Sequence, residues 1–415
     1  MAKQESLSVW MYGRHVATLT RARDRLSLAY TQEAQASYDV NTPLLSVSLP
    51  VGPQSFPHRK TYNFFDGLLP EGEVRRMLAY DLRLTVDDTF GLLRALGRDC
   101  AGALILLPEG ETPPDPASQK PIPLTEEELA SRLRQLSVEP LGIDGKVRVS
   151  LAGVQQKMVL SRLPSGQWAL PIHGLPSTHI LKRADSRFPD MVANEAFCLA
   201  VGRHLGLSVA EASLLEMPEP ILVVARYDRT IAPGGKISRI HQEDLTQALG
   251  IGSNAKYEEN GGPNLRAIAR LLRDWTLGPT SLDQLLDVTF LNMLVGNGDA
   301  HAKNLSLLHQ ESGAVSLAPA YDIMSTVFYP QADLRPGMYV NQKTSINDIS
   351  PSDIIAEAKS WGLNQDRVTT RIAHLLDRLP AAIAAAASEV PTVPPELIAL
   401  VNSKGRSYAN GLSLR

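Results

Sequence analysis

The sequence predicts an α+β protein rather than a chain of repeating βαβ units. Three short runs of alternating apolar and polar residues open the chain between Leu7 and Thr31. A second group of short apolar runs lies between Lys146 and Asp228, and most of the chain after Asp228 has apolar residues at helical spacing. Grouped strands followed by helices are typical of the α+β class. The sequence shows no internal repeat of about 20–50 residues, which argues against a solenoid.

Residues 1–107 are predicted to form a small β-rich α+β subdomain. The opening runs indicate an antiparallel meander, because short polar turns separate them. Two later segments have the apolar spacing of helices, and a third indicates a buried strand. In chain order the segments are LSVWMYG, VATLT, RLSLAYT, EGEVRRMLAYDL, DDTFGLLRALG and AGALILLP.

Residues 108–124 are predicted to be a linker, and we place a domain boundary there. Six prolines lie between Pro108 and Pro123, among Glu, Gly, Ser and Gln. This composition resists helix and sheet and favours extended, polyproline-like backbone. A helix is predicted directly afterwards, because Thr125 and Glu128 have the spacing of a capping box, in which each side chain bonds the other's backbone N–H.

Residues 125–415 are predicted to hold several strands and then mainly helices. The region from Lys146 predicts strands, a short polar loop and one long helix before the helical remainder begins. In chain order these segments are the strands KVRVS, KMVLSRL and THILKRA, the helix DMVANEAFCLAVGRHLG, the strands ASLLEM and ILVVARYD, and a closing alanine-rich helix, LPAAIAAAASE.

The composition indicates a globular protein of two or three domains. The chain has 415 residues, 44% of them hydrophobic, and 41 basic against 44 acidic residues leave a net charge of −3. This balance argues against non-specific coating of a polyanion. The two cysteines, Cys100 and Cys198, have no CxxC spacing, which argues against a disulfide framework or a cysteine metal site. No signal peptide or membrane span is evident, so we expect a cytoplasmic protein.

The stretch VGNGDAHAKNLSLLH is the most informative one for chemistry. The apolar helical run LDVTFLNMLV stops at Gly296–Gly298, and Asp299, His301, Lys303 and Asn304 follow. Polar and ionisable side chains on a loop between two apolar elements are where catalytic groups concentrate.

The spacing of Asp299 and Asn304 equals that of the protein-kinase catalytic loop. In that loop the Asp accepts the proton of the substrate hydroxyl and the Asn holds Mg²⁺. An amide oxygen suits this cation, which prefers oxygen ligands. The alternative interpretation of this segment is structural: Asn-Gly forms a turn and Asp299 caps it.

Other segments supply the remaining parts of a phosphoryl-transfer site, in the order in which a kinase presents them. Asp322 follows a short apolar strand and is a candidate second metal ligand. Lys182 lies on a predicted strand before a helix that carries Glu195, which permits a strand-Lys to helix-Glu ion pair. Taken alone, Asp322 is explained as a turn residue and Lys182 as a solvated strand end.

The turn SLAGVQQK has the small residues Ser150, Ala152 and Gly153, which let backbone N–H groups approach a phosphate. It matches neither GxGxxG nor GxxxxGK[ST], and as a lone hairpin loop it carries little weight. A metal hydrolase that uses Asp299, His301 and Asp322 is the competing chemistry, but it leaves this turn and the strand lysine without a purpose.

Taken together, these segments resemble the HipA serine/threonine kinase toxins of bacterial type II toxin–antitoxin systems. The similarity extends over the full length. The segments that carry it are FFDGLLPEGEVRR, VSLAGVQQK, HILKRAD, NEAFCLAVGRHLGL, ARYDR, QEDLTQALG, NGDAHAKN and PAYDIMST.

The resemblance implies a two-lobed, protein-kinase-like core, similar to phosphoinositide 3/4-kinases, behind an N-terminal HipA-type subdomain. The subdomain would be residues 1–107 and the kinase-like domain residues 125–415. Within that domain we expect an ATP-binding lobe at about residues 146–245 and a mainly helical lobe at about 246–415.

The resemblance also implies roles for individual residues, with ATP and Mg²⁺ as cofactors. Asp299 resembles the catalytic base and His301 a catalytic-site member near the metal and phosphates, while Asn304 and Asp322 resemble the magnesium ligands. Glu195 as a partner of Lys182 is our inference from spacing alone. The residues expected to bind ATP are Ser150, Leu151, Ala152, Gly153, Val154, Gln155, Gln156, Lys157 and Lys182, with Glu243 and Leu245 contributing main-chain groups to adenine.

Ser150 lies where the family has an autophosphorylated serine in its phosphate-binding loop. A phosphate there adds a charge of about −1.5 to −2 close to the phosphates of ATP, so repulsion is expected to inactivate the enzyme. The sequence departs from ordinary protein kinases at Tyr321–Ile323, which replaces their Asp-Phe-Gly motif.

The resulting hypothesis is a non-specific serine/threonine protein kinase that phosphorylates an aminoacyl-tRNA synthetase, the glutamyl enzyme first, and so inhibits translation and causes growth arrest or persistence. The resemblance further implies a small HipB-like helix-turn-helix antitoxin as partner, with operator DNA bound through it. The alternative is a catalytically silent ATP-binding corepressor that acts with this antitoxin.

Overall fold

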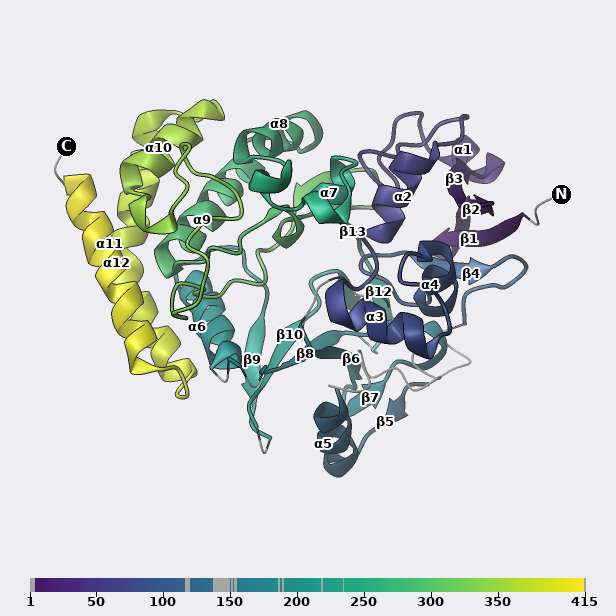
Figure 1. Ribbon diagram of the computed structural model, residues 1–415, viewed down its shortest axis with the longest axis horizontal. Helices are drawn as coiled ribbons and strands as arrows, with labels where there is room; N and C mark the ends of the chain where they lie inside the picture. Colours follow the sequence, from purple (N-terminus) through teal and green to yellow (C-terminus); the bar gives the residue numbers. More distant parts are fainter. Residues whose placement is uncertain are drawn as a thin grey trace. The chain divides into compact units, whose positions relative to one another are not determined.

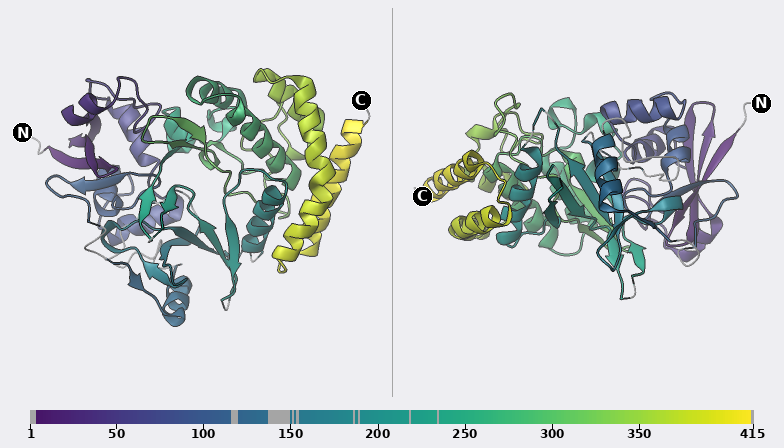
Figure 2. Two further views of the ribbon diagram at one scale, coloured as in Figure 1. Left: turned by 180° about the vertical axis from the view of Figure 1, so that it is seen from behind. Right: turned by 90° about the horizontal axis from the view of Figure 1, so that it is seen from below.

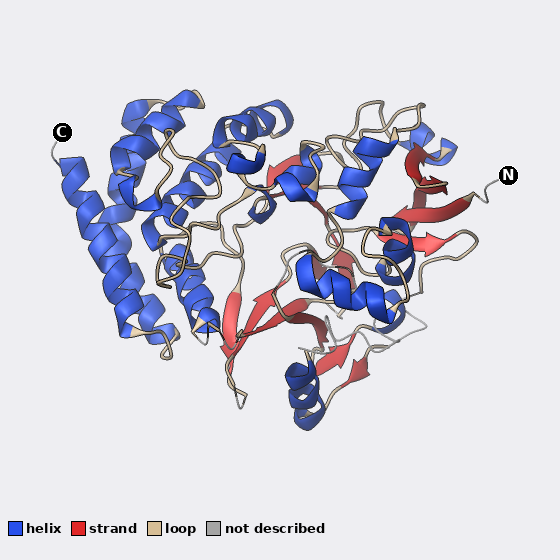
Figure 3. Cartoon of the chain, in the orientation of Figure 1, coloured by secondary structure: helices blue, strands red, loops and turns tan. Residues whose placement is uncertain are grey.

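A computed structural model describes residues 4–115, 120–136, 150, 152, 155–185, 187–188, 190–217, 219–233 and 235–413 of the chain. The chain divides into two compact units. The first comprises Met1–Arg183, Val223–Ser253 and Leu307–Ala314, and the second comprises Ala184–Leu222, Asn254–Ser306 and Val315–Arg415. Helices and strands occur in both units, so the predicted α+β class is confirmed (Figures 1 and 3).

The first unit opens with a four-stranded antiparallel sheet in the order β3-β2-β1-β4. Its strands are β1 (Glu5–Met11), β2 (Arg14–Ala22), β3 (Arg25–Tyr30) and β4 (Ile105–Pro108). The first three strands confirm the predicted meander. Tyr12 and Gly13, between β1 and β2, both have positive φ, 51° and 78°, as a two-residue type I′ hairpin requires.

A second sheet of this unit contains the strand that carries Lys182. Its strands run in the order β5-β7-β6-β8-β10 and comprise β5 (Ile122–Pro123), β6 (Lys157–Arg162), β7 (Trp168–Leu170), β8 (His179–Arg183) and β10 (Ile221–Ala225). The expectation that residues 108–123 resist sheet formation is therefore wrong at both ends, because Pro108 ends β4 and Ile122–Pro123 form β5. Pro123 is accommodated because β5 is an edge strand, where a missing N–H breaks no ladder. The strand expected at KVRVS lies outside the described residues except for Ser150, which is not in a strand.

The helices of the first unit are short. They are α1 (Gln32–Ser37), α2 (His58–Asp66), α3 (Gly72–Asp81), α4 (Thr89–Leu96), α5 (Glu126–Gln135) and α7 (Leu245–Ala248), together with the 3₁₀ turn η1 (Ile172–Gly174). The capping box predicted for α5 is present. Thr125 Oγ1 accepts from the backbone N–H of Glu128 at 3.2 Å, and the Glu128 carboxylate accepts from the N–H of Thr125 at 2.8 Å.

The remaining strands of the chain are short. Two of them form a hairpin of the first unit that the sequence did not predict. The strands are β9 (Ala212–Leu215), β11 (Arg229–Ile231), β12 (Ile237–Arg239), β13 (His241–Asp244), β14 (Ser306–His309) and β15 (Val315–Leu317), with β11 and β12 paired as the hairpin.

The second unit is mainly helical. Its helices are α6 (Met191–His204), α8 (Leu265–Trp275), α9 (Thr280–Val295), α10 (Pro351–Ser360), α11 (Gln365–Glu389) and α12 (Pro395–Ser413), and its 3₁₀ turns are η3 (Glu258–Asn260), η4 (Ala302–Asn304) and η5 (Ile346–Asp348); η2 (Ser253–Ala255) begins at the end of the first unit. Helix α11 packs against both α6 and α12 (Figure 2). Helices α6 and α9 are buried along most of their length, so their ends provide a rigid base for the loops that follow. Among the described residues, no helix is both long and apolar enough to cross a membrane.

Candidate active site

The loop that carries Asp299 starts at a sharp helix end. Helix α9 stops at Gly296, whose φ of 75° is left-handed, a conformation that glycine adopts without strain. A Cβ atom at this position would lie 2.4 Å from Cγ2 of Val327, so only glycine fits. The next residue, Asn297, donates to Asn292 Oδ1 at 2.8 Å and accepts from the N–H of Asp299 at 3.1 Å. The end of α9 thereby fixes the position of Asp299.

The five-residue spacing of Asp299 and Asn304 has a direct structural reason. The side-chain amide of Asn304 donates to the backbone carbonyl of Asp299 at 3.1 Å. Within the turn, the N–H of His301 donates to the same carbonyl at 2.8 Å, and the N–H of Asn304 donates to the carbonyl of His301 at 2.9 Å. The amide nitrogen of Asn304 thus orients the side chain within the loop, and its oxygen, Oδ1, is the atom that can bind a cation.

Asp299 does not act as a helix cap. Its carboxylate is exposed and accepts a hydrogen bond from the Tyr257 hydroxyl at 2.6 Å. The residue before the following 3₁₀ turn is His301, which makes no capping bond. The ring of Tyr257 packs edge-on against His301, with 5.0 Å between centroids, and His301 is itself buried. The cap proposed for Asp299 by the structural interpretation is therefore wrong, whereas the turn it predicted at Asn297-Gly298 is present.

Asp322 is held next to this loop by the residue that precedes it. The Tyr321 hydroxyl donates to the carbonyl of Lys303 at 2.6 Å and lies 2.7 Å from Ser306 Oγ. Asp322 itself is exposed and has a φ of 59°, a strained conformation for a residue with a side chain. Strained backbone of this kind concentrates at functional sites.

Two further polar contacts brace the same segment, and neither could be predicted from the sequence. Thr326 Oγ1 accepts from the N–H of Gly298 at 2.7 Å. The side chain of Asn194, on α6, accepts from the N–H of Ser325 at 2.7 Å and donates to its carbonyl at 2.9 Å. No motif spacing points to these residues, although Asn194 lies in a segment that carries the family resemblance. They connect α6, the Asp322 segment and the Asp299 loop.

A cleft of about 380 Å³ opens beside Asp299 in the second unit. This volume lies in the range of about 300–1,000 Å³ that holds ligand-sized groups. Apolar, aromatic and charged side chains all contribute to its wall. The lining residues are Phe188, Met191, Tyr257, Glu259, Gly298, Asp299, Met324, Thr326, Tyr329, Gln331, Ala332, Asp333, Arg335 and Pro336.

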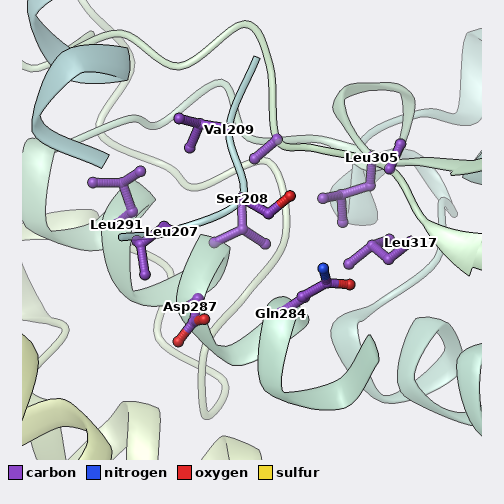
Figure 4. A pocket seen from close by; sticks show the side chains of 11 residues that line it. Leu207, Ser208, Val209, Gln284, Asp287, Leu291, Leu305 and Leu317 are labelled. Carbon is purple, nitrogen blue, oxygen red and sulfur yellow. The ribbon is translucent and has the colours of Figure 1, made fainter. Parts of the chain in front are cut away.

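A second cavity of the same unit is too small for a ligand. It measures about 10 Å³ and lies among Leu207, Gln284, Asp287, Leu291 and Leu305, with other apolar side chains (Figure 4). A volume of about 10–15 Å³ is what one water molecule needs. The cleft beside Asp299 is therefore the better candidate for binding.

Ser150, in the first unit, is completely buried. Its hydroxyl donates to the carbonyl of Leu68 at 2.7 Å, and its N–H donates to the carbonyl of Asp99 at 3.1 Å. Of its neighbours in the expected phosphate-binding loop, Leu151, Gly153 and Val154 lie outside the described residues.

The end of this loop is held to the strands that follow it. The carbonyl of Ala152 accepts from Lys157 Nζ, and the carbonyl of Gln156 accepts from the N–H of Arg183 at 3.3 Å. Gln155 and Gln156 are half-buried. Lys182 is 8% exposed and faces Lys157 as its antiparallel partner across β6 and β8.

Glu195 is buried on α6 in the second unit, whereas Lys182 belongs to the first. An ion pair between these two residues therefore stays a prediction.

The side chain of Glu243, on β13, is engaged in contacts within the protein and is not available to a nucleotide. Its carboxylate accepts from Ser46 Oγ at 2.5 Å and from the N–H of Val47 at 2.9 Å, and it lies 2.9 Å from His309 Nε2. Leu245 starts α7 and is fully buried. At Glu243 and Leu245 the main-chain groups, rather than the side chains, are therefore suited to contact a nucleotide.

A buried ionic network lies behind Ser150, and it involves the ARYDR segment. Arg229 Nη2 lies 2.9 Å from Asp99 Oδ1, and Arg226 Nη2 lies 2.7 Å from Asp228 Oδ2. Burial favours the neutral form of Asp99, but the guanidinium groups of Arg229 and Arg226 outweigh it and hold the pKa of this carboxyl below its usual value. The network thus fixes the backbone carbonyl that Ser150 contacts.

The residues of the Asp299 loop fit a magnesium–nucleotide complex. Asn304 and Asp322 offer an amide oxygen and a carboxylate, the hard ligands that Mg²⁺ prefers, and this cation usually keeps waters and phosphate oxygens as its other ligands. Among the described residues, no group of three or more His, Cys, Asp and Glu side chains is placed to hold a metal ion by itself. This donor set suits a metal shared with a phosphate.

Comparison with known proteins identifies the family. The model of the HipA N-terminal domain matches residues 7–107, and that of the HipA-like C-terminal domain matches residues 149–383. The protein Y4mE of Sinorhizobium fredii is 39% identical over 386 residues, which cover 91% of each chain.

The serine/threonine-protein kinase toxin HipA of Shewanella oneidensis is 31% identical over 335 residues, covering 77% of this chain and 76% of that one. In the solved complex of the Shewanella oneidensis proteins HipA and HipB with operator DNA, one chain superimposes with a TM-score of 0.83 at 26% identity. This match covers 98% of the present chain and 97% of the other. The chain therefore belongs to the HipA family of serine/threonine kinase toxins.

Proposed function

We propose that this protein is an ATP- and Mg²⁺-dependent serine/threonine protein kinase. The observation that carries the proposal is the construction of the Asp299 loop. The Asn304 amide bonds the carbonyl of Asp299, and the Tyr321 hydroxyl ties the segment of Asp322 to the carbonyl of Lys303. These bonds support a base at Asp299 with candidate oxygen ligands at Asn304 and Asp322. A cleft large enough for a substrate group opens beside the same carboxylate.

In this proposal each residue has a defined task. Asp299 accepts the proton of the substrate hydroxyl as that oxygen attacks the γ-phosphorus and the bond to ADP breaks. Asn304 and Asp322 would hold the metal ion, which when bound would supply positive charge to the phosphate oxygens, and Lys182 binds the α- and β-phosphates. His301 packs against the ring of Tyr257 and so supports the loop that carries Asp299.

We further propose that Ser150 is an autophosphorylation site that switches the enzyme off. The Ser150 hydroxyl is buried against the carbonyl of Leu68. A phosphate carries a charge of about −1.5 to −2, and neither this carbonyl nor that of Asp99 can donate a hydrogen bond to it. Phosphorylation of Ser150 therefore requires that the loop leave this site and prevents its return.

The test of kinase activity uses the full-length protein with ATP and Mg²⁺. We expect the intact mass to increase by one phosphate, located on Ser150. Two controls, Asp299→Asn and Ser150→Ala, should remove the added phosphate for different reasons, and only Ser150→Ala should still phosphorylate another protein. If the unaltered chain never transfers phosphate to itself or to any protein, the proposal is wrong.

The proposed target is an aminoacyl-tRNA synthetase, with the glutamyl enzyme as the first candidate, because the family resemblance implies it. Phosphorylation of this enzyme would halt translation and lead to growth arrest, and it places the activity in the cytoplasm. The purified synthetases, each incubated with the kinase and with its Asp299→Asn variant, would reveal the target by a mass increase. If no synthetase increases in mass, this substrate class is excluded.

The proposed partner is a small HipB-like helix-turn-helix antitoxin, through which operator DNA is bound. The chain resembles the HipA that was solved together with HipB and operator DNA, over nearly its whole length. That similarity also supports the second candidate function, a corepressor that needs no catalysis. Expression of the chain without the antitoxin separates the two: a toxic effect that disappears with Asp299→Asn supports the kinase, whereas a scaffold should be indifferent to this exchange.

A further inference from the structure

Resting on the proposed kinase function, we infer that the cleft beside Asp299 selects the acceptor segment of the protein substrate. It takes one apolar side chain near the acceptor serine or threonine and favours a basic residue at its rim. The cleft and the Asp299 carboxylate share one wall. A segment that brings its hydroxyl to Asp299 must therefore place neighbouring side chains in this cleft.

One part of the wall is apolar and adaptable. Phe188, Met191, Met324 and Tyr329 line it and are all half-buried. The rings of Phe188 and Tyr329 contact each other edge to face, with centroids 5.0 Å apart and planes at 71°. Methionine side chains are flexible and polarisable, so they adjust to different apolar groups. A leucine or similar residue next to the acceptor would cover this surface.

The rim of the cleft is acidic. Arg335 Nη1 lies 2.6 Å from Glu259 Oε2, and Arg335 Nη2 lies 2.7 Å from Asp333 Oδ2. One guanidinium thus faces two carboxylates, and the Asp299 carboxylate in the same cleft accepts from the neutral Tyr257 hydroxyl. The charged lining groups carry a net −2, which disfavours an acidic acceptor segment and favours a basic one.

The experiment is a set of synthetic peptides with a single serine, in which each flanking position carries Leu, Ala, Lys or Glu in turn. The full-length protein phosphorylates them with ATP and Mg²⁺, and kcat/KM is measured. We expect Leu to exceed Ala by about tenfold at one position, the effect of apolar groups in a pocket. Lys should exceed Glu at another position by about two- to fivefold, as for an exposed ion pair.

Two variants test the assignment to this cleft. Met191→Ala should reduce the preference for Leu, and Glu259→Gln should reduce the preference for Lys, each without changing the other. Asp377→Asn is the matched control, because Asp377 is exposed on α11 and does not line the cleft. Thermal unfolding of each variant checks that the fold is intact.

The outcomes separate this inference from the proposed function. If peptides are phosphorylated at equal rates whatever their flanks, or if Met191→Ala and Glu259→Gln leave the preferences unchanged, the cleft does not select the substrate although the protein is a kinase. If neither any peptide nor Ser150 gains phosphate, the kinase proposal itself fails, and this inference with it.

Discussion

The hydrogen bond from Tyr257 to Asp299 yields the sharpest prediction on the catalytic loop. The Tyr257 hydroxyl donates to Oδ1 of the Asp299 carboxylate, and the two oxygen atoms are 2.6 Å apart. Tyr257→Phe removes this single donor and keeps the ring that packs against His301. We expect the carboxylate to lose its fixed orientation, so that Oδ2 no longer faces the acceptor hydroxyl in every complex.

The size of the effect follows from the exposure of the pair. A hydrogen bond to a charged group contributes about 1.5–3 kcal/mol when shielded, but an exposed carboxylate recovers part of this from water, which leaves about 0.5–1.5 kcal/mol. Because the loss concerns the reacting geometry, it should reduce kcat by about two- to tenfold. The KM for ATP should not change, since neither atom is expected to touch the nucleotide.

The assay is steady-state phosphotransfer to a protein or peptide substrate, with kcat and KM measured separately. Tyr80→Phe is the matched control, because Tyr80 is 84% exposed on α3 of the first unit and should have no effect. A different result would refute the reasoning. If Tyr257→Phe raised kcat/KM for the protein substrate, the phenol would be competing with the acceptor hydroxyl for Asp299 rather than positioning the carboxylate.

Three further predictions concern metal binding and stability. Asp322→Gly should stabilise the fold by up to about 1 kcal/mol in thermal unfolding, because it relieves the left-handed backbone, yet it should abolish phosphotransfer; retained activity would exclude Asp322 as a ligand. Burial and the neighbouring His309 lower the pKa of His241 to about 3. Between pH about 6.5 and about 3 the histidine is protonated in the unfolded chain but neutral in the folded protein. The free energy of unfolding, measured in urea, should therefore fall on acidification by up to about 1.4 kcal/mol per pH unit, and it should fall less steeply in His241→Gln. Asp99→Ala should lower the free energy of unfolding by about 3–5 kcal/mol, because the buried Arg226 and Arg229 then share only the Asp228 carboxylate. Glu389→Ala, at an exposed ion pair, should lower it by less than about 1 kcal/mol.

Local patterns in the sequence predicted most elements correctly, but they could not predict which strands pair over long distances in the sequence. The β1–β3 meander, the α5 capping box and the end of α9 are confirmed, because each depends on neighbours in the sequence. Strand β4 was expected, but not its place beside β1, where Leu106 pairs with Val9. The β11–β12 hairpin was missed because three-residue strands have too few positions to show alternation.

The candidate site shows the same division. The spacing of Asp299 and Asn304 could be read directly, since one side chain bonds the other residue's carbonyl. The roles of Tyr257 and Asn194 could not be predicted, because their partners, Asp299 and Ser325, lie 42 and 131 residues away and no spacing pattern connects them. The glycine at 296 illustrates the intermediate case: the helix stop was predicted, but its reason, the close approach of Val327, is visible only in three dimensions.

The buried ions around Asp99 have a consequence for how this protein can be divided. The two family models match residues 7–107 and residues 149–383, on either side of residues 108–148, which indicates two modules. Yet Arg226 donates to the carbonyl of Cys100, and Arg229 donates to Asp99 and to the carbonyl of Gly102. Cutting the chain between the modules would leave the buried Asp99 carboxylate in one piece without its arginines, while Arg226 and Arg229 in the other piece would share the single carboxylate of Asp228. The modules can be recognised separately in evolution, but we expect them to be expressed and to fold only as one polypeptide.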